Sequence, residues 1–480
     1  MRTEIKMSAL MTPVLLLLVS PAFAQFEGPC SKGEKRELQE SIQAHNENIY
    51  RLNYKFKNVW YFAGPVPQEV TREVSLEDVH AYLTKLEPRK TGVLFHAKQG
   101  NKFCTWLVDY KGGVTFDIQQ DITGSHGKLV IPSEWQALGV RGATHLRADP
   151  QAEPGPQELS KNRPTIEEWD SVLRPITQLL FPDPILKKFL ALEIDTLIVV
   201  PITVATGENL HNNKLDETKD FTLTVSAVPF GALPVSAEKR LIDVASVIVA
   251  PGFFIFAQDP GPTRQTFLKP LVVGDPGTGA LSLPGARKEA IDVARIFGVQ
   301  ALTSKDATKA KVLSTLRKHA KRIDVIHFAT HGLANNVDPL DESLLVFSDD
   351  ELTAREIGHL RIPASFQKGP GKDQPLLAKH PLVVMSACQT GKGKDFSVGT
   401  IGLARAWQWA GAAQVVVTLW SVDDTATQRL MTQFMKLVAG KDPVDKALQK
   451  AMQQFRGDDS NPASWASFQL FGSPELLHEN

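Results

Sequence analysis

The sequence predicts an α/β fold, with a mainly parallel sheet covered by helices on both faces and a smaller α+β region before it. From about residue 190 onward, short apolar runs alternate with segments of helical spacing, and several of those runs contain no polar residue. Such runs are typical of parallel strands, because both faces of a parallel sheet are buried. The length of 480 residues also exceeds the usual size of a single core, which indicates two folded parts.

Composition and charge exclude several classes of function. Hydrophobic residues make up 42% of the chain and charged residues 22%, which is typical of a globular protein. Lys and Arg together number 53, as do Asp and Glu, so no overall field favours nucleic acid or an anionic membrane surface. We therefore expect no nucleic acid partner; a protein or peptide partner is expected from the reactive residues described below.

The first 24 residues have the pattern of a signal peptide. Arg2 and Lys6 precede an apolar stretch of about 11 residues, and the small residues Ala22 and Ala24 fit a cleavage site after Ala24. The stretch is well short of the roughly 20 residues that span a bilayer, although a lipid-facing anchor is the alternative. The sequence predicts a periplasmic or secreted protein that has no membrane attachment after removal of residues 1–24.

The three cysteines bear on this prediction. Paired cysteines tend to form disulfides in an oxidising compartment, where an odd cysteine stands out as a free thiol. Cys30 and Cys104 both lie in the N-terminal part and could bridge each other, which would leave Cys388 unpaired. The alternative is that all three are small buried apolar residues.

Residues 25–150 are predicted to form helices and a β-meander. Apolar residues at three-four spacing predict an amphipathic helix over residues 34–60, packed on its own domain or, alternatively, pairing two copies into a homo-oligomer. A second helix is predicted near residues 75–85, followed by three strands between residues 91 and 118.

Residues 151–189 are predicted to form a linker and a helix. The first part is polar and rich in proline, as linkers are. Thr165 and Glu168 then form the pattern of a capping box, which predicts the start of a helix. We expect Pro175 and Pro182 to interrupt that helix.

Residues 190–480 are predicted to form one α/β domain. The predicted strands are 196–202, 221–228, 268–273, 299–302, the runs that end before His331 and Cys388, and 413–420. The predicted helices are 285–297, 307–320, 401–410, and two that begin near residues 425 and 443.

Two apolar runs of this domain each end at a reactive side chain. Residues 323–332 read Ile-Asp-Val-Ile-His-Phe-Ala-Thr-His-Gly, and residues 382–391 read Leu-Val-Val-Met-Ser-Ala-Cys-Gln-Thr-Gly. Catalytic groups gather at the carboxyl ends of parallel strands, so we expect His331 and Cys388 to lie close together. A thiolate beside an imidazole is a nucleophile suited to acyl transfer.

Each of these residues has an expected role. His331 would protonate the leaving amine and then activate water. The backbone N–H groups of Gly332 and Cys388 are predicted to form the oxyanion hole. The alternative is a core cysteine and a hydrogen-bonded core histidine. Ser386 is a competing nucleophile, but it lacks the Gly-x-Ser-x-Gly pattern of a hydrolase.

No metal or cofactor is expected. His327 and His331 are four residues apart, as on zinc-binding helices, but in a strand this separation spans roughly 13 Å. Zinc–nitrogen bonds are near 2 Å, so we expect His327 to be structural. The glycine-rich residues 274–279 follow a predicted strand but lack the Gly-Lys-Ser/Thr of a phosphate-binding loop.

Several short motifs occur together in one order along the chain. They are Leu283–Ala290, His327–Gly332, Pro339–Phe347, Leu352–Ile357, Ser386–Gly391, Gly402–Ala406, Ala410–Ala413 and Trp420–Asp424. In these motifs the chain resembles the CHAT-domain family of caspase-like and separase-like clan CD cysteine peptidases. The resemblance implies a caspase-like three-layer sandwich and an endopeptidase whose dyad is His331 and Cys388.

The resemblance also implies a substrate-binding site. In separase-like relatives, an acidic residue beyond the strand that follows the cysteine helps to receive a basic P1 side chain, and Asp423 and Asp424 lie in the similar stretch here. Either aspartate could instead cap the helix that follows. The alternative function is an inactive CHAT-domain scaffold that binds a partner; the tetratricopeptide repeats common in the family are not visible in this sequence.

Overall fold

The computed structural model describes most of the C-terminal part of the chain and selected segments before it. The described residues are 30, 35–45, 75–99, 102–119, 164–202, 210–211, 214–215, 222–250, 269–277, 282–334, 340–362, 374–375, 377, 380–387, 394–396, 399–420 and 424–474. The predicted signal peptide, most of the predicted linker, Cys388 and Asp423 lie outside the described residues.

One 11-stranded sheet organises the described residues, in the order β3-β2-β1-β4-β7-β20-β19-β16-β10-β8-β9. Its strands are β1 (Thr91–Gln99), β2 (Lys102–Asp109), β3 (Val114–Gln119), β4 (Thr196–Pro201), β7 (Ser246–Val249), β8 (Pro270–Gly274), β9 (Leu302–Thr303), β10 (Val325–Ala329), β16 (Leu382–Ser386), β19 (Gln414–Thr418) and β20 (Phe468–Gly472). Short ladders beside it are formed by β5 (Leu210–His211), β6 (Lys214–Leu215), β11 (Gly332–Leu333), β12 (Leu344–Val346), β13 (Glu351–Thr353), β14 (Arg361–Ile362), β15 (Gln374–Pro375), β17 (Lys394–Phe396) and β18 (Gly399–Ile401).

The sheet consists of two parallel halves that run in opposite directions. Strands β9, β8, β10, β16 and β19 are parallel to one another, and so are β20, β7, β4 and β1. The halves meet at the antiparallel pair β19·β20, and β2 and β3 extend the outer edge as an antiparallel meander. The mainly parallel sheet predicted from the apolar runs is therefore confirmed.

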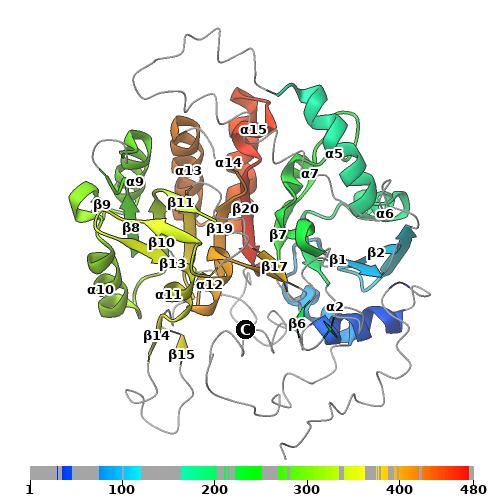
Figure 1. Cartoon of the computed structure of the whole chain (residues 1–480). Helices are drawn as coiled ribbons and strands as arrows, with labels where there is room; N and C mark the ends of the chain where they lie inside the picture. The colour runs from blue at the N-terminus through cyan, green and yellow to red at the C-terminus, as the bar shows by residue number, and fades with distance from the viewer. Residues whose placement is uncertain are drawn as a thin grey trace, which may run out of the picture.

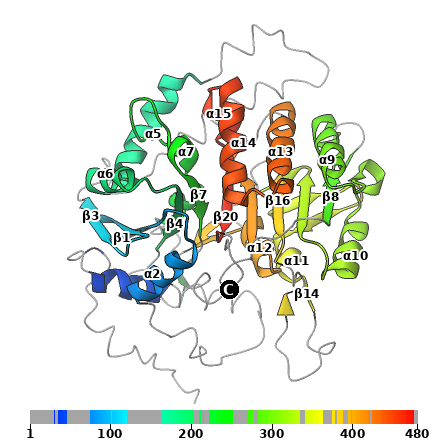
Figure 2. The same cartoon turned by 180° about the vertical axis from the view of Figure 1, so that it is seen from behind.

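Helices cover both faces of the sheet, which makes three layers. Figure 1 shows α9, α13 and α14 on one side and α10, α11 and α12 on the other, and Figure 2 shows the same arrangement from behind. The α-helices are 35–45, α2 (Leu76–Lys85), α5 (Ile166–Leu180), α6 (Asp183–Ala191), α7 (Leu241–Val244), α9 (Pro284–Ile296), α10 (Lys309–His319), α11 (Ala354–Gly358), α12 (Leu403–Trp409), α13 (Asp424–Ala439), α14 (Val444–Asp458) and α15 (Pro462–Trp465). The 3-10 helices are η3 (Thr222–Ala227), η4 (Phe230–Ala232) and η6 (Ser304–Asp306).

Two predicted elements differ from the structure. Where a strand was predicted over residues 221–228, residues Thr222–Ala227 form the 3-10 helix η3, in which Val225 is buried, as is Val228 just after it. Its β-branched residues favour a strand only where they pack on a sheet, so the prediction was wrong. The helix opened by the capping box at Thr165 also continues through Pro175 to Leu180. The proline removes one helical hydrogen bond, which the burial of neighbouring apolar side chains offsets.

The N-terminal meander belongs to the same sheet as the rest of the chain. β1 pairs in parallel with β4 from Thr91↔Thr196 to His96↔Pro201, so the sheet crosses the boundaries predicted at residues 150 and 190. A second apolar core lies on this side, between α2, the helix 35–45 and the meander. In this core Cys30 and Cys104 form a disulfide, with Cα atoms 5.7 Å apart. In the described part of the chain, every helix is too short or too polar to cross a bilayer.

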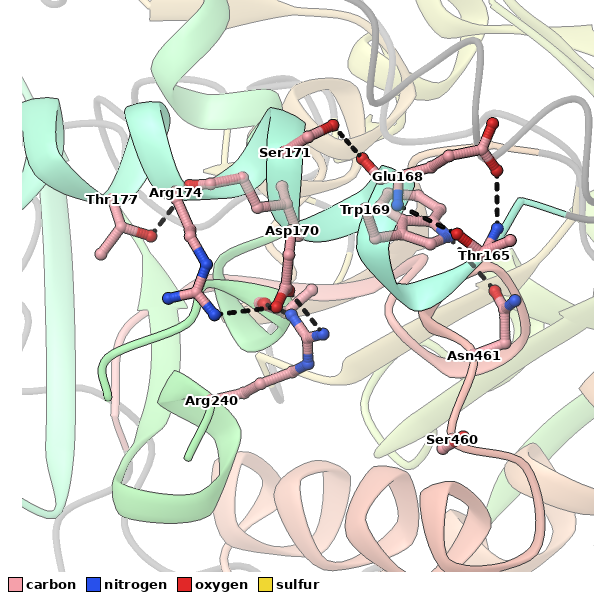
Figure 3. Close-up of polar contacts among 12 residues, drawn as sticks. Thr165, Glu168, Trp169, Asp170, Ser171, Arg174, Thr177, Arg240, Ser460 and Asn461 are labelled. Atoms are coloured by element: carbon pink, nitrogen blue, oxygen red, sulfur yellow. Dashed lines mark hydrogen bonds and ion pairs between the residues drawn. The ribbon is translucent and has the colours of Figure 1, made fainter. Parts of the chain in front are cut away.

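Helix α5 is tied to the C-terminal part of the chain by polar contacts. The indole Nε1 of Trp169 donates to Oδ1 of Asn461 over 3.2 Å, and Nδ2 of Asn461 donates to the carbonyl of Pro164. At the neighbouring residue Asp170, Oδ1 accepts a hydrogen bond from Nη2 of Arg240 over 2.8 Å (Figure 3). These bonds fix α5 on the half of the sheet that contains β4, β7 and β20.

Candidate active site

The two predicted catalytic residues follow strands β10 and β16 in the sequence. The strands are neighbours in the parallel half-sheet, and their ladder ends with Ala329 paired to Ser386. His331 lies two residues beyond Ala329, and Cys388 lies two residues beyond Ser386 in the sequence. Neighbouring strands lie about 4.8 Å apart. His331 and Cys388 therefore follow the last pair of this ladder by the same number of residues in the sequence.

A small hairpin holds the segment that contains His331. The carbonyl of His331 accepts a hydrogen bond from the N–H of Val346 on β12. The hydroxyl of Thr330 donates to the carbonyl of Val346 over 2.6 Å. Gly332 then begins β11, which pairs with β12. The histidine is half-buried. The hairpin thus fixes the backbone on both sides of His331.

The strand end that precedes Cys388 is also held in place. The hydroxyl of Thr418, on the neighbouring strand β19, donates to the carbonyl of Ala387. Ser386 and Ala387 are both buried. Cys388 itself lies outside the described residues, so its distance from His331, and the oxyanion hole predicted at Gly332 and Cys388, stay predictions.

A buried carboxylate, which the sequence analysis missed, lies between these two strands. Glu289 of α9 has Oε1 2.7 Å from Nε2 of His327 and Oε2 3.1 Å from the hydroxyl of Ser386, which donates to it. Burial raises the pKa of Glu289, while His327 and Ser386 act in the opposite direction. A signal was present in the sequence, because the spacing of Ala286, Ala290 and Val293 places position 289 on the buried face of the helix.

Asp424 lies at the start of α9 as well as at the start of its own helix α13. Its Oδ2 accepts a hydrogen bond from the backbone N–H of Gly285 over 2.6 Å. A Cβ at position 285 would lie 2.4 Å from the Asp424 carboxyl carbon, so the close approach requires glycine. The carboxylate therefore caps α9, where the helix dipole favours a negative charge.

A second aspartate, Asp275, shapes the loop between β8 and α9. It is buried at the carboxyl end of β8, with φ of 48°. Its carboxylate accepts from the N–H of Leu283 over 2.8 Å and from Nε of Arg287 over 2.6 Å. Its own N–H donates to the carbonyl of Ala329, the last residue of β10. Asp275 thus fixes the entry to α9 relative to the strand that leads to His331.

Among the described residues, no group of three or more His, Cys, Asp and Glu side chains is arranged to hold a metal ion. His327 is fully buried and is bound to Glu289, as expected for a structural histidine. The described groups at the carboxyl edge of β8, β10 and β16 are joined by hydrogen bonds through Glu289 and Asp275.

The chain is similar in sequence to two curated proteins. In sequence, the chain is 28% identical to tetratricopeptide repeat protein 28 of Homo sapiens over 41% of this chain and 9% of that protein, and the Mus musculus protein gives the same values. The chain thus spans about 9% of the length of these curated relatives.

Among solved structures, separase of Saccharomyces cerevisiae in complex with securin is similar over 92% of this chain and 34% of that chain, with a TM-score of 0.52 and 10% identity. The Arg-specific cysteine proteinase gingipain R is similar over 67% of this chain and 70% of that chain, with a TM-score of 0.38 and 9% identity. The similarity to separase shows that the caspase-like fold is shared.

A family model described as the CHAT domain matches residues 171–473, which include α5, most of the sheet and the edge with His331. The match covers more than half of the chain. By this match and by the shared caspase-like fold, the chain belongs to the CHAT domain family.

Proposed function

We propose that this protein is a cysteine endopeptidase whose nucleophile is Cys388 and whose general acid and base is His331. The observation that carries the proposal is the register of β10 and β16, in which both residues lie two positions beyond the last pair, Ala329 and Ser386. The caspase-like fold of the CHAT family supports it, because this fold is also that of peptidases of clan CD.

The reaction proceeds through an acyl-enzyme. The Cys388 thiolate attacks the peptide carbonyl, and the tetrahedral oxyanion is stabilised by the backbone N–H groups of Gly332 and Cys388. The carbon–nitrogen bond then breaks as the His331 imidazolium protonates the leaving amine. The neutral imidazole takes a proton from water, the hydroxide attacks the thioester, and the thiolate is released.

A preference for Arg or Lys at P1 is part of the proposal. Asp423 and Asp424 follow β19, the strand next to β16. The Asp424 carboxylate is held at the start of α9 by the Gly285 N–H. A negative charge fixed in this place would attract a basic side chain.

Export to the periplasm or the extracellular space is likewise a proposal. It is supported by the signal-peptide pattern of residues 1–24 and by the disulfide between Cys30 and Cys104. Disulfides persist in oxidising compartments and are rare in the cytosol.

The test uses the full chain with a peptide library and an acyloxymethyl ketone that carries Arg at P1. We expect covalent labelling at Cys388 and cleavage after basic residues, with both lost in Cys388→Ala and in His331→Ala. Cys388→Ala that still cleaves, or wild-type protein that is neither labelled nor active on any peptide of the library, would contradict the proposal.

The alternative is a catalytically inactive CHAT scaffold that binds a protein partner. One observation favours it: the matched curated relatives are named for tetratricopeptide repeats rather than for a peptidase activity. A scaffold predicts that Cys388→Ala leaves every measurable interaction unchanged while the wild-type protein cleaves nothing.

A homo-oligomer is a further proposal, in which the helix predicted over residues 34–60 pairs two copies of the chain. The molar mass of the protein in solution tests it.

A further inference from the structure

The Glu289 carboxylate contacts both strands that lead to the candidate catalytic residues. One oxygen is bonded to His327 of β10. His331 lies four residues later, just beyond the end of that strand. The other oxygen accepts from Ser386, which lies two residues before Cys388 at the end of β16. All three side chains are at least nine-tenths buried.

The helix that carries Glu289 is bound to the rest of the candidate site. The N–H of Gly285 in its first turn donates to Asp424, and Arg287 donates to Asp275 at the end of β8. Helix α9 is thus bonded to the strands that precede the candidate base and nucleophile through Glu289, and to the candidate substrate-binding acid through its first turn.

This network is a costly way to stabilise a core. Burial penalises an ionised Glu289, and a buried polar network of this kind contributes little net stability compared with apolar side chains of similar size. In addition, Nδ1 of His327 is buried without a hydrogen-bond partner among the described residues. Stability alone therefore does not account for a carboxylate in this position.

We propose that Glu289 is a positioning residue, which fixes the carboxyl ends of β10 and β16 relative to each other and so sets the geometry between the His331 imidazole and the Cys388 thiol. The inference rests on the proposed function. Catalysis tolerates little displacement, because a shift of about 1 Å can reduce a rate by about a hundredfold.

The cysteine content provides a measurement that needs no substrate. The chain has three cysteines, and Cys30 and Cys104 are joined in a disulfide. Alkylation by iodoacetamide of the full, non-reduced chain therefore reports on Cys388. The rate as a function of pH measures the thiolate that His331 supports, since an unperturbed thiol has a pKa of about 8.5.

A matched control exists in the other half of the sheet. Asp445 of α14 is a buried carboxylate that accepts from the hydroxyl of Ser246 over 2.7 Å and from Nη1 of Arg89 over 3.0 Å. It has the same kind of partners as Glu289 but no contact with the candidate site. Asp445→Asn therefore measures the effect of disrupting a buried network as such.

We expect Glu289→Gln to slow alkylation at neutral pH by about tenfold or more, and to move the inflection of the pH profile toward that of an ordinary thiol. Asp445→Asn should keep the wild-type rate and profile. If Glu289→Gln does not fold, the Ser386→Ala protein takes its place as the test. This substitution removes one of the two contacts of Glu289, and we expect it to shift the pH profile in the same direction.

Two results would overturn the inference: a wild-type rate and profile in the folded Glu289→Gln or Ser386→Ala protein, or an equal slowing by Asp445→Asn. Failure of the proposed function looks different. In that case wild-type protein and His331→Ala would react alike, with the profile of an unperturbed thiol, and the inference would fall with it.

Discussion

The Asp424 carboxylate serves two purposes that a single substitution can separate. It caps α9 through the Gly285 N–H, and under the proposed function it also receives a basic P1 side chain. Asp424→Asn keeps an acceptor oxygen for the Gly285 N–H but removes the charge, and we expect it to cost about 0.5 kcal/mol of unfolding free energy. It should also reduce kcat/KM for substrates with Arg at P1 more than for substrates with a neutral P1 residue.

Asp349 provides the control for this prediction. Its Oδ1 accepts from the N–H of Lys309 at the start of α10, which is the same kind of cap supplied from another segment. Asp349→Asn should lower stability by a similar amount without changing the P1 preference. Equal P1 preferences in the two variants would show that Asp424 is only a cap.

A second prediction at this scale concerns His96 on β1. The side chain is buried, its Nε2 is 3.0 Å from the carbonyl of Leu180, and burial lowers its pKa from 6.5 to about 4. Between these values the unfolded chain binds a proton that the folded chain does not, so stability falls as the pH is lowered from 6.5 to about 4. The expected contribution is about 3 kcal/mol.

The measurement is denaturation by urea at pH 7, 5.5 and 4, for wild type and His96→Gln. Glutamine can donate to the Leu180 carbonyl but does not titrate, so the variant should lose less stability on acidification. Parallel pH dependences of the two proteins would contradict the assignment.

At the scale of elements, one asparagine contributes to the attachment of α5. Asn461 accepts from the indole of Trp169 and from the N–H of Ala463, and it donates to the carbonyl of Pro164 (Figure 3). Asn461→Ala leaves a buried indole N–H without a partner, and we expect it to cost about 2 kcal/mol. Hydrogen exchange of α5 should increase more than that of α13.

The exposed residue Ser171 on the same helix supplies the comparison. Its hydroxyl donates only to the carbonyl of Glu168, within α5. Ser171→Ala should leave both stability and exchange near wild type. An unchanged exchange of α5 in Asn461→Ala would show that other contacts hold this helix.

Local sequence patterns predicted elements in both halves of the sheet. The capping box at Thr165, the meander at 91–118 and the strands that lead to His331 and Cys388 all rest on neighbouring residues, and the structure contains them at nearly the same positions. The 221–228 segment failed because strand preference depends on tertiary packing. Glu289 was missed for a related reason: its partners, His327 and Ser386, are 38 and 97 residues away in sequence.

At the scale of the whole molecule, the parallel sheet was predictable but its extent was not. Uninterrupted apolar runs identify buried strands, yet they contain no information on which strands pair. The pairing of β1 with β4 joins residues about 100 positions apart, and the pair β19·β20 reverses the direction of the sheet. Such pairings depend on the packed core rather than on local sequence.

The disulfide gives a prediction at this scale. Cys30 and Cys104 are separated by 74 residues, and closing a loop of this length stabilises a fold by about 4 kcal/mol in the chain-entropy account. Reduction should therefore lower the unfolding free energy of the Cys388→Ala protein by about this amount. The variant has no free thiol, which prevents disulfide exchange, and the Cys30→Ser/Cys104→Ser/Cys388→Ala protein should be insensitive to reductant. Equal stabilities with and without reductant in the Cys388→Ala protein would contradict the prediction.

The position of β20 has a consequence for how the protein is made. This strand lies between β7 and β19 and is the only link in the sheet between its two halves, yet it is formed by residues 468–472. During synthesis on the ribosome, both halves emerge before the strand that joins them. We conclude that the two halves of the sheet cannot join until residues 468–472 have been synthesised, so the strands made before them wait for their central neighbour.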